Sequence, residues 1–177
     1  AIYFKIMIYD NYFSISPLDG RYSKELTELK YFFSEYAYMK YRIEIEVEYF
    51  IELTNIIPQL SNFPKNAIEE MRNFYKKFTV TDLIEIKNYE KIINHDVKAV
   101  ELFLRDKFDF MKLETFYKEF IHFGLTSQDI NNSAYPLMIK DAIKNVYIPC
   151  FEDLRNILFE ISKKYKDFPM LSRTHGQ

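Results

Sequence analysis

The stretch ELTELKYFFSEYAYMKYRIEIEVEYFIELTN, residues 25–55, decides the fold that this sequence predicts. It contains no glycine and no proline, and its apolar side chains recur at steps of mostly three or four residues. Because that step keeps side chains on one face of an α-helix, we expect one long amphipathic helix here. The residues of the expected apolar face are Leu29, Phe33, Tyr36, Ile43, Val47 and Phe50.

Helical spacing continues beyond the prolines that follow this stretch, and capping residues mark where further helices start. Serine, threonine, asparagine and aspartate favour such starts because their side chains accept hydrogen bonds from the free amides of the first turn. The expected helices are residues 68–78, 79–93 with caps from Thr79 to Asp82, 94–108 with Asn94 as the N-cap, and 114–123 closed by Gly124.

Residues 134–166 have the same spacing, but Pro136 and Pro149 lie within them. Each proline removes an internal hydrogen bond and clashes with the preceding turn, so we expect a kink or a break at both. No stretch alternates apolar and polar residues as a β-strand does, and the sequence has no repeat of fixed period. The predicted fold class is therefore all-α, with the polar chemistry concentrated in loops.

Composition excludes several classes of function. A net charge of −2, from 24 basic and 26 acidic residues, provides no basic surface for nucleic acid or a membrane, so we expect small molecules or proteins as partners. The single cysteine, Cys150, excludes an internal disulfide and a cysteine-based zinc site, fits a reducing compartment, and has apolar neighbours that predict a buried thiol. The three histidines lack metal-ligand spacing, so no metal or cofactor is expected.

Two expected helix starts are rich in polar side chains. Asn94, His95 and Asp96 form one, and Thr126 and Ser127 begin the other. Backbone amides at a helix start are free to bind an anion. The alternative is that these residues only cap their helices. Capping explains the first cluster fully. It does not explain the second, where six polar residues occur in near succession although a cap needs only one.

Two loops also carry candidate groups. SISPLDGRY is dense in turn-forming residues and presents Arg21 and Tyr22 just before a helix, where Arg21 has the alternative of pairing with a surface carboxylate. The last six residues, SRTHGQ, place His175, which exchanges a proton near neutral pH, among the hydroxyl, guanidinium and amide groups that include Gln177. His122 has aromatic and aliphatic neighbours and is expected to be packed or half-buried.

Four sequence motifs stand out in these segments: SPLDGRY at 16–22, NHDVKAVE at 94–101, HFGLTSQDINN at 122–132 and SRTHGQ at 172–177. In this order they resemble the adenylosuccinate lyase family of the fumarase/aspartase superfamily. The resemblance extends over roughly residues 14–177, and agreement at four separate motifs is far more specific than a match to SRTHGQ alone.

The resemblance implies a cytoplasmic, cofactor-free homotetramer of purine biosynthesis. Such an enzyme releases fumarate by β-elimination from adenylosuccinate, giving AMP, and from the related succinylated carboxamide ribotide. It implies that His175 is the general acid and that His95 supports substrate binding and catalysis. The substrate contacts that it implies are Arg21, Tyr22, Asn94, Asp96, Thr126, Ser127 and Gln177.

The resemblance also implies a domain organisation. Residues 1–13 are treated as an extension, residues 14–124 as a helical N-terminal domain, and residues 125–177 as the truncated start of a central helical bundle with a long, kinked first helix. The family's base, a serine on a Ser-Ser-x-Met-Pro-x-Lys-x-Asn loop, has no counterpart in this sequence, so we expect the 177-residue chain alone to be inactive. The alternatives are a non-catalytic helical interaction module and another lyase of the superfamily.

Overall fold

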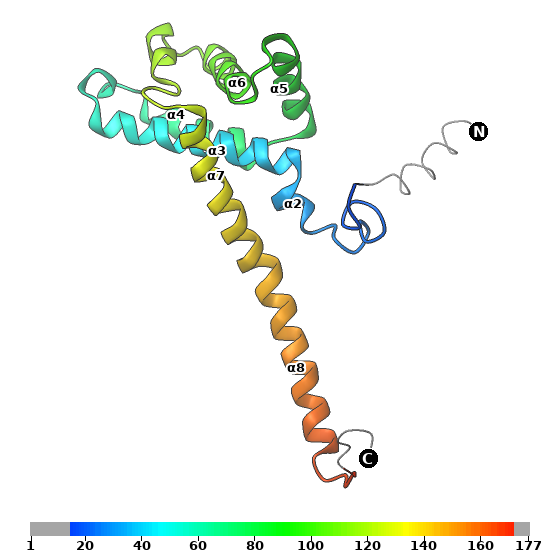
Figure 1. Ribbon diagram of the computed structural model, residues 1–177. Coiled ribbons are helices and arrows are strands. Elements are labelled where there is room, and N and C mark those ends of the chain that lie inside the picture. The colour runs from blue at the N-terminus through cyan, green and yellow to red at the C-terminus, as the bar shows by residue number, and fades with distance from the viewer. Residues whose placement is uncertain (1–14, 172–177) are drawn as a thin grey trace, which may run out of the picture. The chain divides into compact units, whose positions relative to one another are not determined.

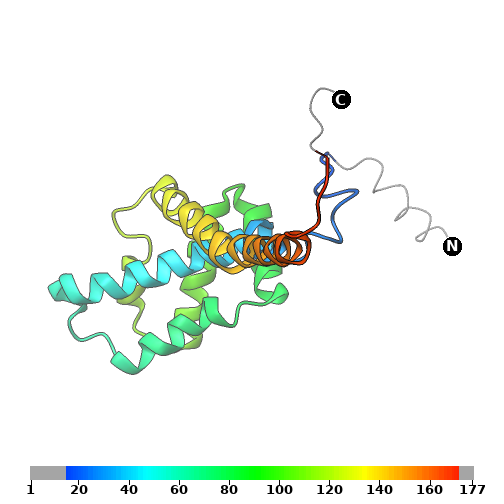
Figure 2. The same ribbon diagram turned by 90° about the horizontal axis from the view of Figure 1, so that it is seen from below.

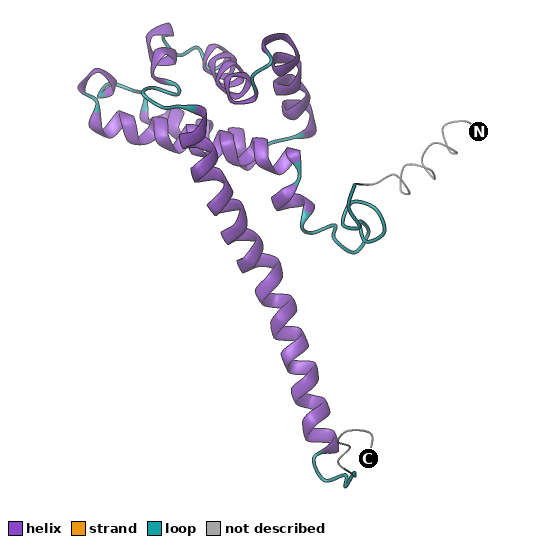
Figure 3. Ribbon diagram, in the orientation of Figure 1, coloured by secondary structure: helices purple, strands orange, loops and turns teal. Residues whose placement is uncertain are grey.

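The computed structural model describes residues 15–171, and every regular element in this range is helical (Figures 1 and 3), which confirms the predicted all-α class. The chain divides into two compact units, one that ends at Lys140 and one that begins at Asp141. The α-helices are α2 (Lys30–Phe33), α3 (Glu35–Ile56), α4 (Lys65–Lys76), α5 (Val80–Ile93), α6 (Asp96–Phe110), α7 (Ser127–Ala142) and α8 (Ile148–Tyr165), with 3-10 turns at Pro58–Leu60 and Thr115–Phe120 and a π segment at Ile143–Tyr147.

The single helix predicted over residues 25–55 is wrong in its first third. Residues 20–29 form successive turns, α2 is one short helix, and α3 begins only after Ser34. Ser34 is extended (φ −78°, ψ 165°), and its hydroxyl accepts a hydrogen bond from the Ala37 amide at 3.2 Å. A serine in this role ends the preceding helix and caps the next one, an effect that apolar periodicity does not register.

The predicted caps of α5 are confirmed. The Asp82 carboxylate accepts a hydrogen bond from the Thr79 amide at 2.9 Å, and the Thr79 hydroxyl accepts one from the Asp82 amide at 3.3 Å. This reciprocal pair satisfies two amides that the first turn leaves free. The helix predicted over residues 114–123 contains only a 3-10 turn, and Gly124 follows it in the left-handed conformation (φ 72°).

The two prolines do not break the helical run that starts with α7. Pro136 lies on an exposed position of α7, where water can satisfy the carbonyl that loses its amide partner. Before Pro149 the backbone changes to the π segment, and α8 follows directly. The wider turn of a π segment gives the proline ring room beside the preceding carbonyls. A break is therefore absent at Pro136, and at Pro149 the helix changes locally from α to π.

Helix α3 is the central element of the first unit, and Figure 2 shows α4 running beside it. The apolar core gathers around Phe50, whose ring meets Phe63 and Phe108 edge to face with centroids 5.2 and 5.1 Å away. Phe63 in turn meets Tyr117 at 5.0 Å. Such rings contribute about 1.5–3 kcal/mol each through the area they remove from water. The core thus fixes α3 against α6, whose first residue, Asp96, is one of the predicted site residues.

Helix α8 belongs to the second unit, and all of its residues are exposed. Its side chains include Phe151, Leu154 and Leu158, which are 58%, 51% and 57% exposed. Cys150 is exposed as well, so the predicted buried thiol is wrong, because the described part of this unit has no second helix to cover α8. Among the described helices, none is long and apolar enough to cross a membrane.

Candidate active site at the starts of α6 and α7

His95 caps the N-terminus of α6. Its Nδ1 accepts a hydrogen bond from the Lys98 amide at 3.1 Å, which leaves Nε2 to carry the proton in the neutral ring. The prediction that Asn94 caps this helix is wrong. Asn94 instead ends α5 in the left-handed conformation (φ 52°), and its amide donates to the Glu90 carbonyl at 2.8 Å. Asparagine tolerates that conformation better than most residues, so the chain turns sharply and presents His95.

Thr126 and Ser127 lie at the start of α7, the second predicted helix start. The Asp129 carboxylate accepts hydrogen bonds from the Thr126 amide at 2.7 Å and from its hydroxyl at 3.0 Å, and these bonds hold the pKa of Asp129 below its usual value. The Ser127 hydroxyl lies 3.4 Å from Nε2 of His95, although the two residues are 32 positions apart. The structure therefore brings together two site residues predicted from different loops.

Asp96, the first residue of α6, pairs with a buried arginine. Its Oδ2 lies 2.6 Å from Nη2 of Arg42, and its Oδ1 accepts a hydrogen bond from the Val97 amide at 2.9 Å. Burial alone would raise the pKa of Asp96, but the hydrogen bond and charge of Arg42 outweigh it, and the pKa lies below the usual value. Asp96 is held ionised in this way with Oδ1 4.0 Å from Nδ1 of His95.

Arg42 was not singled out in the sequence, where it is one of several charged residues in an amphipathic stretch and no local signal marks it as buried. Its side chain is 2% exposed. Besides Asp96, its Nε donates to the Asn131 amide oxygen at 3.1 Å, and its guanidinium lies 3.8 Å from the centre of the Tyr38 ring. The Tyr38 hydroxyl donates to the same oxygen of Asn131 at 2.6 Å. One guanidinium thus connects α6 and α7 through α3.

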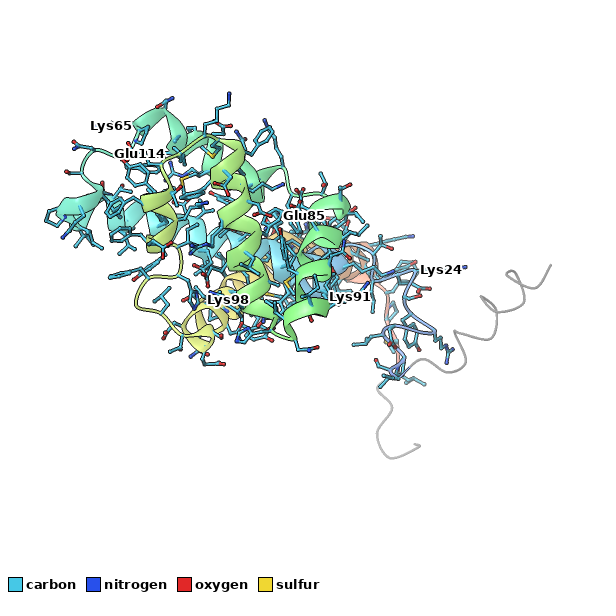
Figure 4. The ribbon with its side chains drawn as sticks, turned by 90° about the horizontal axis from the view of Figure 1, so that it is seen from above. Lys24, Lys65, Glu85, Lys91, Lys98 and Glu114 are labelled. Atoms are coloured by element: carbon cyan, nitrogen blue, oxygen red, sulfur yellow. The ribbon has the colours of Figure 1, made fainter. Side chains whose placement is uncertain are left out.

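A groove of about 520 Å³ opens beside His95. Figure 4 shows the region from above, with Lys91 labelled on α5 and Lys98 on α6. Lysines together with the amides of a helix start suit an anionic ligand. Within the described range, no group of three or more His, Cys, Asp or Glu side chains is placed to hold a metal ion. The groove is lined by Lys87, Glu90, Lys91, Asn94, His95 and Asp96.

The remaining predicted site residues are not joined to this place. Arg21 and Tyr22 are exposed in the turns before α2, with the Arg21 guanidinium 5.2 Å from the Tyr22 ring centre. In the described range, no hydrogen bond or ion pair links either of them to the starts of α6 and α7. His175 and Gln177 lie outside the described residues. The structure therefore locates the predicted binding groups of two helices and leaves the predicted acid as an expectation.

Residues 20–177 match a protein family described as Lyase, which covers most of the chain. The chain belongs to this lyase family. Adenylosuccinate lyase from Dictyostelium discoideum is 44% identical over 179 residues, 95% of this chain and 37% of the relative. Those from Buchnera aphidicola of Schizaphis graminum and from Escherichia coli K12 are 42% and 39% identical over 166 residues, 93% of this chain and 36% of each relative. The chain thus spans little more than a third of the length of these curated relatives.

A second histidine, His122, lies in the loop that leads to α7. Its side chain is 16% exposed, as the prediction of a packed histidine requires, and its Nδ1 lies 2.5 Å from Oε1 of the fully buried Glu46. The hydrogen bond to Glu46 raises the pKa of His122, although burial opposes it. Burial raises the pKa of Glu46 itself, although His122 opposes that shift. Oε2 of Glu46 has no hydrogen-bond partner among the described residues.

Proposed function

We propose that this chain carries the first part of an adenylosuccinate lyase, which releases fumarate from adenylosuccinate to give AMP, and from the succinylated carboxamide ribotide of the same biosynthesis. The observation that carries the proposal is the meeting of His95 and Ser127 at two helix starts, next to a polar groove whose lining includes two lysines and two carboxylates. The names of the relatives support the same activity.

The proposed substrate carries a phosphate and two carboxylates, so it needs several anion-binding groups. The positive ends of the helix dipoles at the starts of α6 and α7 and the lysines of the groove supply them. Asn94, Asp96, Thr126 and Ser127 are the proposed contacts at these two helix starts, and Arg21, Tyr22 and Gln177 are proposed from the sequence. Asp96, already paired with Arg42, suits a hydrogen-bond donor of the substrate, such as a ribose hydroxyl, better than its phosphate.

Cleavage of the carbon–nitrogen bond requires two proton transfers. A base removes the proton beside a carboxylate of the succinyl group, and an acid protonates the purine nitrogen as it leaves. We assign the acid to His175. His95, whose neutral ring has the proton on Nε2, faces Ser127 and donates a hydrogen bond from that atom to substrate or serine. The proposed base is a serine that this sequence does not supply, so the isolated 177-residue chain should not release fumarate.

A chimeric enzyme tests this function. The 177 residues would replace the matching first part of the Escherichia coli adenylosuccinate lyase, which is 39% identical to them. The chimera should consume adenylosuccinate and form fumarate. His175→Ala and His95→Ala should each lower kcat by about 10²- to 10⁴-fold, the usual contribution of a proton-transferring or polarising side chain. Lys77→Ala, at an exposed position after α4, is the matched control and should leave the rate unchanged.

Two results would contradict the assignment. One is a folded chimera with the sedimentation behaviour of the parent and no fumarate release, measured beside an active parent enzyme. The other is full activity after His175→Ala. Fumarate release by the isolated chain that disappears with His175→Ala would instead disprove only the claim that its base is missing.

We also propose that α8 is part of a homotetramer interface of the complete cytoplasmic enzyme, with residues 14–124 as its N-terminal domain and residues 125–177 as the start of its helical bundle. The half-exposed apolar side chains of α8 support an oligomer, because buried apolar area drives most stable association. Sedimentation distinguishes this proposal from an independent interaction module. The isolated chain should associate heterogeneously, whereas an evolved module should sediment as one species.

A further inference from the structure

Four polar side chains lie along one face of α3, and together they form what we call the polar stripe: Tyr38, Arg42, Glu46 and Tyr49. Steps of four, four and three residues stack side chains on one helical face. Arg42 and Glu46 are only 2% and 1% exposed. Burial of charged groups costs free energy that an ion pair seldom offsets fully, so apolar residues of similar size would have held α3 in place at least as well.

The first half of the polar stripe ties α6 to α7. Arg42 binds Asp96 of α6 at 2.6 Å and Asn131 of α7 at 3.1 Å, and the Tyr38 hydroxyl donates to Asn131 at 2.6 Å. Burial and the neighbouring Tyr135 hydroxyl raise the pKa of Tyr38 to about 12, so this hydroxyl keeps its proton as a donor. Each bond is directional and fixes the rotation and register of the helix it reaches.

The second half of the polar stripe ties down the loop before α7. Glu46 accepts a hydrogen bond from the ring of His122 at 2.5 Å, and the Tyr49 hydroxyl donates to the Phe123 carbonyl at 2.7 Å. His122 has a left-handed backbone (φ 59°), a conformation that a residue with a side chain keeps only when its surroundings impose it. The loop then leads into Thr126 and the start of α7.

We propose that the polar stripe consists of positioning residues, which hold the start of α6 and the loop into α7 so that His95 and Ser127 remain within hydrogen-bond distance. The inference rests on the proposed function only in that this contact belongs to the substrate site. Apolar packing of Ala37 against Ala134 and Met138 already brings α3 to α7, but it lacks the direction that sets one hydroxyl against one ring nitrogen.

Amide hydrogen exchange of the 177-residue chain tests this inference, followed residue by residue by NMR at a dilution where sedimentation shows the monomer. Tyr38→Phe and Tyr49→Phe each remove one hydroxyl and keep the ring, so the chain should still fold. Each should speed exchange of the Lys98 and Thr126 amides about fivefold, the effect of one lost hydrogen bond, with little change in α4. Tyr36→Phe is the matched control, because its hydroxyl donates to the Phe78 carbonyl, away from both helix starts, and it should leave those amides unchanged.

The ring nitrogens of His95 provide a readout that a purely structural role would not change. In the unaltered chain, ¹⁵N shifts should report a proton on Nε2, and the two stripe variants should move that signal while Tyr36→Phe does not. The inference would be overturned if amide exchange became uniformly faster over the whole unit, or if it did not change at the starts of α6 and α7. Because exchange requires no catalysis, an inactive chimera with the expected exchange pattern would contradict the proposed function alone.

Discussion

The buried surface of α3 has two halves, on adjacent faces of the helix, that are built in opposite ways. In the aromatic half, Phe50 is surrounded by Phe63 and Phe108, with ring centroids 5.2 and 5.1 Å away. In the polar half, Arg42 and Glu46 are equally inaccessible, yet each is held by polar partners, at 2.6 and 2.5 Å. The aromatic half excludes water in any of several arrangements, whereas the polar half tolerates only one.

This difference shows that the aromatic residues of α3 mainly stabilise the unit, whereas its polar residues mainly fix the positions of neighbouring segments. Apolar packing is non-directional and scales with the area removed from water, so it holds the unit together without selecting a single register. Hydrogen bonds and ion pairs contribute less net free energy, but they fail when the atoms move by a fraction of an ångström. The helix starts with the candidate site lie at the polar half, where placement matters more than free energy.

The largest expected effect belongs to the aromatic half. Phe50→Ala should lower the free energy of unfolding by about 3–5 kcal/mol, because it removes a buried ring and leaves a cavity between two others. Urea denaturation followed by circular dichroism measures the loss. Phe110→Ala is the control, because that ring is 82% exposed. Equal losses from both variants would contradict the position of Phe50 at the centre of the core.

Arg42→Met tests the polar half and should cost about 2 kcal/mol, because Asn131 and Asp96 lose a donor while methionine fills similar space. Asp96 is partly open to water, which limits the loss. The same denaturation experiment applies, with Arg155→Met at an exposed position of α8 as the control. A stability equal to that of the unaltered chain, with His95 and Ser127 undisturbed, would show that Arg42 does not connect the two helices.

The pH dependence of stability tests the Glu46–His122 pair. Both pKa values are raised in the folded chain, so the folded state holds more protons than the unfolded chain as pH rises above the ordinary values of 4.5 and 6.5. The stabilisation from His122 is fully present below 6.5 and is lost as pH rises through its raised pKa. The unfolding free energy should therefore fall as pH rises above 6.5 and through the raised pKa of His122.

Glu46→Gln is the variant that isolates this dependence, since it keeps the size of the side chain and removes its charge. Glu101 also raises the pKa of His122 and Lys98 lowers it, so part of the slope should remain. Parallel pH curves for the variant and the unaltered chain would exclude the pair as a source of the dependence.

The smallest expected effect concerns the cap where α3 begins. Ser34→Ala should cost about 1 kcal/mol, because the Ala37 amide loses its acceptor at the end of the polar half. Ser34→Asp keeps an acceptor and should stay within a few tenths of a kcal/mol of the unaltered chain. Thermal unfolding distinguishes the two variants, and equal melting temperatures would show that the cap contributes nothing.

Local chemistry explains which predictions were confirmed. Thr79 and Asp82 were identified as caps because a capping box involves residues three positions apart, and the all-α class followed from spacing alone. The break at Ser34 was missed because periodicity does not count a single hydroxyl that competes for a backbone amide. Asn94 was assigned to the wrong helix because left-handed backbone and N-cap roles favour the same residue type.

The sequence by itself determined the all-α class, most of the helices and the two polar helix starts, because these depend on residues within a few positions of one another. Only the tertiary structure decided that Ser127 faces His95 and that Arg42 and Glu46 hold the segments that carry them. Those contacts join positions far apart in the chain, and spacing along a sequence contains no information on which helix faces meet. The aromatic core decides how the helices meet, and the polar stripe then selects the atoms that touch.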